Sequence, residues 1–253
     1  MNKLGLIITF VVLQLSGCAT LKSTSEENTK VYLDDSNILH YEGKLSKDAH
    51  QELLKLFHHA NSKPNQLSID STGGEVFLGL ELAHWVYDNN INVHVKGLCA
   101  SSCANYIFPA ANKKLLNKDS VLLWHGGSLQ PSVSELIAEG DESAIEWRLA
   151  EWRFYNKINI NPMISVYGSH RNIPISWYQY PLMFLGLYEQ SFIGFDYSVE
   201  DMEKFGIRNI ILLDGEWDWR KHHEKRDIIK TKIMRVEVPQ KDLSNPFRTP
   251  SKS

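Results

Sequence analysis

The sequence predicts an α/β protein with a mostly parallel sheet, because short apolar strands alternate with helical stretches of about a dozen residues. The composition supports a folded domain: of the 253 residues, 43% are hydrophobic and 23% are charged. A chain of this length can form one good core with a small appendage. The sequence contains no internal repeat that would indicate a solenoid or a propeller.

Charge and histidine spacing exclude several classes of function. The formal net charge is −3, and no basic excess points to a nucleic-acid partner. The ten histidines do not cluster with the three cysteines at zinc-finger spacing. We therefore expect no metal site, and the sequence indicates no cofactor.

The N-terminus is a segment separate from the predicted domain. Lys3 precedes an apolar run over residues 4–15, which is short for a permanent transmembrane helix, and LSGC then ends at Cys18. This pattern resembles the lipobox of bacterial lipoproteins. The resemblance implies a signal peptide over residues 1–17, lipidation of Cys18 and, because Ala19 is not an aspartate, an outer-membrane anchor facing the periplasm. The alternative is an uncleaved membrane anchor.

The predicted location has chemical consequences. The periplasm is oxidising and permits disulfides, and it lacks ATP and coenzyme A. Residues 18–30 are polar without apolar periodicity, which predicts a flexible tether. The folded domain is expected over residues 31–215.

Strands and helices alternate through the first half of this domain. Five segments have strand character: residues 31–33, 37–41, 67–70, 91–95 and 120–124. Ser46 is a predicted N-cap for a helix to about residue 60, Glu75 opens a second helix, and a third ends near residue 111.

The second half is less regular. Residues 132–158 carry one long helical pattern, Ser198 is a predicted N-cap for a helix over 199–205, and residues 207–213 have strand character. Residues 216–253 are interpreted as a C-terminal extension that is partly disordered, with a possible strand over 227–238.

Three groups of candidate site residues follow predicted strands. They are Gly73-Gly74, Ser101-Ser102 and His125. In parallel sheets, ligands bind at the carboxyl ends of the strands, so these groups are candidates for one site.

Their residue types suit nucleophilic catalysis. A serine at the start of a helix is exposed and lies near free backbone amides, but it needs a base to accept its proton. Ser101 fits the nucleophile and His125 the base. Gly74 and Ser102 supply amides for an oxyanion hole, since glycine lets the backbone approach closely.

Five stretches together resemble the proteolytic subunit of the Clp protease. They are NILHYEGKLS, IDSTGGEVFLG, GLCASSCA, SVLLWHGG and DYSVEDMEKFGIRNI, in the order of that family and spread over about residues 31–213. The resemblance implies the crotonase-like βαβ spiral, often assembled into trimers or larger rings, and hence a homo-oligomer. Residue by residue, it implies Ser101 as nucleophile, His125 as base, and Gly74 and Ser102 as oxyanion donors.

The triad carboxylate departs from that family. The position four residues before Ser198 is Gly194, which has no carboxylate. Asp196 is the nearest substitute, and Glu189 is a second option. Loss of the orienting carboxylate lowers the rate of such enzymes, although a serine–histidine pair retains some activity.

Alternatives stay open for single residues. Ser101 can be a simple helix N-cap, and His125 a structural histidine. With Cys18 lipidated, Cys99 and Cys103 are the remaining pair; they are either a disulfide or two small buried hydrophobes at the turn.

The leading hypothesis is a lipid-anchored serine hydrolase of the cell envelope, acting on peptides or proteins. The alternative is a non-catalytic binding or scaffold lipoprotein with a vestigial site, which the missing carboxylate favours. An acyl-CoA crotonase is disfavoured because its cofactor is absent from the periplasm. A relative of signal peptide peptidase A is disfavoured because that enzyme uses a lysine base.

Overall fold

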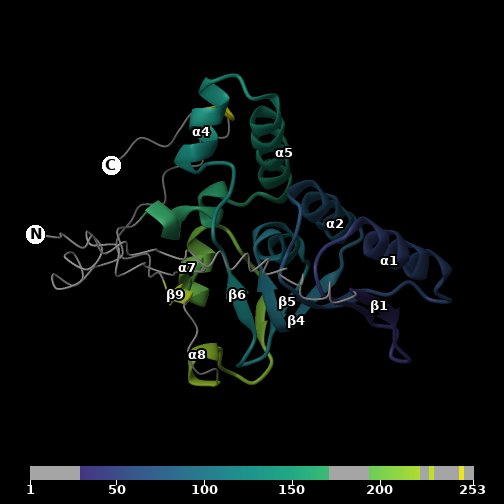
Figure 1. Ribbon diagram of the computed structural model, residues 1–253. Coiled ribbons are helices and arrows are strands. Elements are labelled where there is room, and N and C mark those ends of the chain that lie inside the picture. Colours follow the sequence, from purple (N-terminus) through teal and green to yellow (C-terminus); the bar gives the residue numbers. More distant parts are fainter. Residues whose placement is uncertain (1–28, 171–193, 223–227, 231–244, 248–253) are drawn as a thin grey trace, which may run out of the picture.

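A computed structural model describes residues 29–170, 194–222, 228–230 and 245–247. These residues form an α/β fold whose main sheet is mostly parallel, as predicted (Figure 1). The strands are β1 Lys30–Leu33, β2 Leu39–Glu42, β3 Gln66–Ser71, β4 Asn92–Ala100, β5 Lys114–Leu116, β6 Val121–Leu123, β7 Gly194–Asp196, β8 Ile210–Leu212 and β9 Ile228–Lys230.

The longer helices are α1 Lys47–His59, α2 Val76–Asp88, α4 Pro131–Ala138 and α5 Glu142–Ile158. The shorter ones are the π-helix η1 Cys103–Ile107, α3 Phe108–Ala110, the 3₁₀ helices η2 Pro162–Ser165 and η3 Tyr167–His170, α7 Val199–Lys204 and α8 Trp219–His222. None of the helices in the described ranges is long and apolar enough to cross a membrane.

The main sheet has the order β1-β2-β3-β4-β5-β8, with β6 also beside β4. Only the β1–β2 pair is antiparallel among the described pairs of this sheet. Strand β4 has two neighbours on one side: residues 93–95 pair with β5, and residues 98–100 pair with β6. The last residue of β4, Ala100, therefore lies beside Leu123, the last residue of β6.

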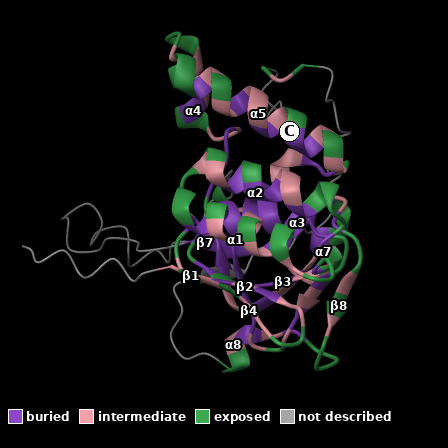
Figure 2. Cartoon of the chain, turned by 90° about the vertical axis from the view of Figure 1, so that its right-hand side faces the viewer, coloured by how far each residue is buried: buried purple, intermediate pink, exposed green. Residues whose placement is uncertain are grey.

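Helices cover one face of this sheet in two layers. In Figure 2, α1, α2 and α3 lie directly against the strands, and α4 and α5 lie beyond α2. The core between sheet and helices is apolar; Leu39, Leu53, Ile69 and Val93 are all fully buried. Helix α5 reaches this core as well, since Phe154 is fully buried and contacts Tyr106 edge to face.

The predicted long helix over residues 132–158 is two helices. Gly140 separates α4 from α5 with a left-handed φ of +86°, and Asp141 caps α5 by accepting a hydrogen bond from the amide of Ala144 at 2.8 Å. Gly140 and Asp141 are the stop and start signals that mark this break in the sequence.

The strands also differ in length from the predictions. Strand β4 continues five residues past the predicted end at residue 95, and the predicted strand over 207–213 is shortened to β8. Strands β5 and β7, three residues each, were not predicted, because so short a run shows no alternation.

Two tryptophans that follow the predicted domain end at residue 215 pack on the domain. Trp217 and Trp219 have 9% and 1% of their surface exposed and belong to the core. Burial of two indole rings holds the start of the predicted extension on the domain. The predicted signal peptide, most of the tether, and residues 231–244 and 248–253 lie outside the described residues.

Candidate active site

Ser101 occupies a constrained strand-to-helix turn. Its amide donates to the carbonyl of Leu123 at 2.9 Å, and its own carbonyl accepts from the amide of Asn105 at 2.8 Å. Between these two bonds its backbone is left-handed, with φ +56°. That conformation costs a non-glycine residue about 1–3 kcal/mol and is found where surrounding structure enforces it, often at functional sites. The residue keeps partial exposure, so its hydroxyl is accessible.

A disulfide brackets this turn. Cys99 and Cys103, four residues apart, are bonded to each other with their α-carbons 5.2 Å apart, and both are fully buried. Cys99 lies near the end of β4 and Cys103 begins η1. The bridge therefore joins the two elements that Ser101 separates, as the disulfide interpretation of the sequence expects.

The predicted glycine turn lies directly against Ser101. Gly73 has φ +82°, and a Cβ added there would come within 2.7 Å of the Ser101 Cβ and 3.0 Å of the Ser102 amide nitrogen. Only a glycine permits so close an approach in this backbone conformation. The turn and the serine are 28 residues apart in sequence and in direct contact in the fold.

Ser102 has a structural partner. Its hydroxyl donates to the carbonyl of Gly74 at 2.8 Å, and the residue is 2% exposed. This bond ties the glycine turn to the start of η1 and leaves Ser101 as the accessible hydroxyl of the pair. The backbone amides of Gly74 and Ser102 donate to no acceptor among the described residues, so both are available as donors.

His125 lies two residues beyond the end of β6, close along the sheet edge to Ser101. Trp124 exchanges both backbone hydrogen bonds with Phe195, at 2.8 and 2.7 Å, which anchors the chain just before the histidine. The His125 side chain is exposed. Within the described ranges its ring has no hydrogen bond to Ser101 or to another residue. The structure thus places the two residues at adjacent strand ends without joining them directly.

Asp196 does not orient His125, contrary to the sequence-based expectation. Its carboxylate is fully buried and accepts two hydrogen bonds from Arg220, at 2.6 and 2.7 Å, and one from the indole of Trp219 at 2.7 Å. A buried carboxylate needs such partners, and a bidentate guanidinium is the strongest available. The carboxylate of Asp196 therefore forms its ion pair and hydrogen bonds with residues of α8.

Neither Gly194 nor Glu189 supplies the third member of a triad among the described residues. A Cβ on Gly194 would lie 2.5 Å from the Trp124 carbonyl oxygen, so this position has no room for a carboxylate side chain. Glu189 lies outside the described residues.

A buried polar cluster that contacts Ser128, in the loop after His125, was not predicted. Glu151 accepts from the amide of Ser128 at 2.7 Å and from the hydroxyl of Tyr106 at 3.1 Å. Arg148 donates from Nε to the Ser128 carbonyl at 3.0 Å. Burial raises the pKa of Glu151 and lowers that of Arg148. A signal was present in the sequence: Arg148 and Glu151 fall on the same helical stripe as the apolar residues of α5.

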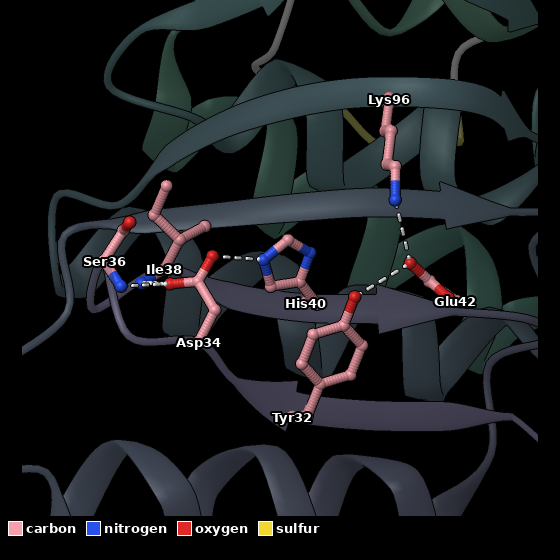
Figure 3. A network of polar contacts seen from close by, with 7 residues as sticks. All are labelled: Tyr32, Asp34, Ser36, Ile38, His40, Glu42 and Lys96. Atoms are coloured by element: carbon pink, nitrogen blue, oxygen red, sulfur yellow. Dashed lines mark hydrogen bonds and ion pairs between the residues drawn. The ribbon is translucent and has the colours of Figure 1, made fainter.

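A second polar cluster lies on strands β1, β2 and β4 and the turn between β1 and β2 (Figure 3). The His40 ring stacks on Tyr32 at 4.5 Å and hydrogen-bonds Asp34 at 2.8 Å, while Glu42 accepts from Tyr32 and from Lys96, each at 3.2 Å. These pairs join β1 and β2 to β4 and satisfy one another. The cluster therefore fastens the edge hairpin.

The described residues contain no group of three or more His, Cys, Asp or Glu side chains that could hold a metal ion. No model of a known protein family matches the chain, and no curated protein matches it either. The function is therefore argued from the geometry of this site.

Proposed function

We propose that this chain is a serine hydrolase acting on peptides or proteins, with Ser101 as nucleophile and His125 as general base. The observation that carries the proposal is the backbone of Ser101: an accessible hydroxyl held in a left-handed strand-to-helix turn. Strained turns of this kind present the nucleophile in other serine hydrolases, and a simple N-cap serine has no need of a left-handed φ.

The chemistry follows from the neighbouring groups. Ser101 Oγ attacks a carbonyl carbon while His125 accepts its proton. The amides of Gly74 and Ser102 stabilise the oxyanion, and His125 returns the proton to the leaving amine. Water then hydrolyses the acyl-enzyme by the same sequence of proton transfers. A mostly parallel sheet with the site at its carboxyl edge supports a fold of the crotonase-like, Clp-protease type.

The second candidate is a binding or scaffold protein with a vestigial site. Two observations favour it: Asp196 is committed to Arg220, and His125 has no hydrogen bond to a described residue. Such a protein would use the same sheet edge to hold a ligand without cleaving it.

We place either protein in the bacterial envelope, anchored to the outer membrane by a lipid on Cys18. The disulfide between Cys99 and Cys103 supports an oxidising compartment. Metabolic labelling with a fatty-acid analogue should mark the wild type and not Cys18→Ser; equal labelling of both excludes this anchor.

A fluorophosphonate probe tests the hydrolase. The full-length protein, purified in detergent, should label covalently. Ser101→Ala should abolish labelling and His125→Ala should reduce it by about 10³-fold or more. Ser102→Ala keeps its backbone amide and should still label, which distinguishes the two serines. A wild-type protein that melts cooperatively and never labels has a vestigial site, and the binding function then replaces the hydrolase.

A further inference from the structure

Helix α5 contacts both segments that carry the proposed catalytic pair. On the nucleophile side, Tyr155 donates to the carbonyl of Asn105 at 2.9 Å and Glu151 Oε1 accepts from Tyr106 at 3.1 Å. On the base side, Glu151 Oε2 accepts from the amide of Ser128 at 2.7 Å. One carboxyl group thus divides its two oxygens between η1, which follows Ser101, and the loop that follows His125.

The loop after His125 depends on such contacts. It has no strand or helix until α4, and its backbone groups are held by side chains: Asn105 Nδ2 donates to the Gly126 carbonyl at 2.7 Å, and Arg148 donates to the Ser128 carbonyl. The loop also passes very close to Glu151. A Cβ on Gly127 would lie 3.0 Å from Glu151 Oε1.

The cluster is sealed from solvent. Glu151 and Ser128 are each 1% exposed, Arg148 is 2% exposed, and Tyr106 is fully buried. In such surroundings, hydrogen bonds between fixed partners are strong and no water replaces a lost one, so the geometry is held firmly. Trp147 adds a further bond by donating to the Tyr106 hydroxyl at 3.2 Å.

Among the described residues, no carboxylate is hydrogen-bonded to the exposed His125 ring, and the described contacts that hold its segment are those of the neighbouring backbone. Resting on the function proposed above, we propose that Glu151 is a positioning residue that ties the Ser101 segment to the His125 segment and so sets the distance between the two side chains. It touches neither the substrate nor the reacting atoms.

Glu151→Gln tests this proposal, because the amide keeps the shape of the carboxyl but cannot accept at both ends. In the full-length protein, the maximal rate of fluorophosphonate labelling should fall by ~10–100-fold, the scale expected for a misplaced catalytic group. The probe concentration for half-maximal rate should stay unchanged. Glu146→Gln, an exposed position on the same helix, is the matched control and should label at the wild-type rate.

Tyr106→Phe removes the hydrogen bond between η1 and Glu151 and keeps the one between Ser128 and Glu151. We expect a smaller loss than for Glu151→Gln, and the double variant should be no slower than Glu151→Gln alone, because the two residues act through one link. This variant also covers the case in which Glu151→Gln fails to fold.

Hydrogen exchange measured by mass spectrometry supplies a readout that needs no activity. Exchange in the peptides over residues 103–110 and 125–130 should be faster in Glu151→Gln and unchanged in Glu146→Gln. If neither peptide changes, or if both loosen while labelling keeps its wild-type rate, the positioning role is wrong. If the two peptides are protected from exchange in the wild type but the wild type never labels, the hydrolase function is wrong. The positioning role, which depends on that function, is then wrong as well.

Discussion

Replacing Gly73 by alanine tests the contact on which the site is built. Two effects oppose the added methyl group. The backbone has φ +82°, a region that costs a side-chain-bearing residue about 1–2 kcal/mol. The new Cβ would also lie 2.5 Å from the Ala100 carbonyl oxygen and 2.7 Å from the Ser101 Cβ, so the backbone of the nucleophile turn must shift.

Such overpacking costs typically about 1–3 kcal/mol, which brings the total to about 2–5 kcal/mol. Gly140→Ala isolates the steric part. Gly140 has nearly the same conformation, φ +86°, and no atom within 4 Å of an added Cβ. The conformational strain and the smaller entropy of the unfolded chain are common to both variants and cancel in the comparison.

The free energies of unfolding, from urea titrations of the full-length proteins, should therefore differ by about 1–3 kcal/mol, with Gly73→Ala the less stable. Its melting temperature should be lower than that of Gly140→Ala by roughly 3–9 °C. Fluorophosphonate labelling should fall in Gly73→Ala alone, because only there must Ser101 move. Equal stability of the two variants would refute the close contact and leave only the left-handed backbone to explain the glycine.

Three further results are expected. Non-reducing mass spectrometry should find Cys99 and Cys103 bridged, and replacing both by alanine should cost about 2 kcal/mol; two free thiols in the protein from its own compartment would contradict the bridge. Asp196→Asn should destabilise the fold by about 3 kcal/mol by leaving a guanidinium uncompensated, with the pH profile of labelling unchanged; a shifted profile would return Asp196 to the His125 site. Burial lowers the pKa of Lys114 to about 8, so the unfolded chain binds more protons at alkaline pH, and the free energy of unfolding should rise by on the order of 2 kcal/mol from pH 7 to 10. Lys114→Met should flatten that rise in urea titrations, whereas an unchanged slope would assign it to other groups.

Local sequence determined where helices begin at a capping serine and in which order strands and helices follow one another. Ser46 and Ser198 cap α1 and α7 as predicted, because a serine followed by a helical pattern satisfies the first free amides whatever packs around it. The order of strands and helices likewise follows from the periodicity of apolar residues. The placement of Ser101 at a strand-to-helix turn could be predicted for the same reason.

Tertiary structure decided which polar groups pair. Asp196 lies two residues from the predicted triad position at Gly194, yet it binds Arg220, 24 residues further along the chain. Glu151 was one charge in a helix rich in charges, and only the packing of α5 against η1 and the loop after β6 brings it to Tyr106 and Ser128. The reason is physical: a buried carboxyl group takes the donors that the fold places within about 3 Å, and that distance is set by the packing of elements far apart in the chain.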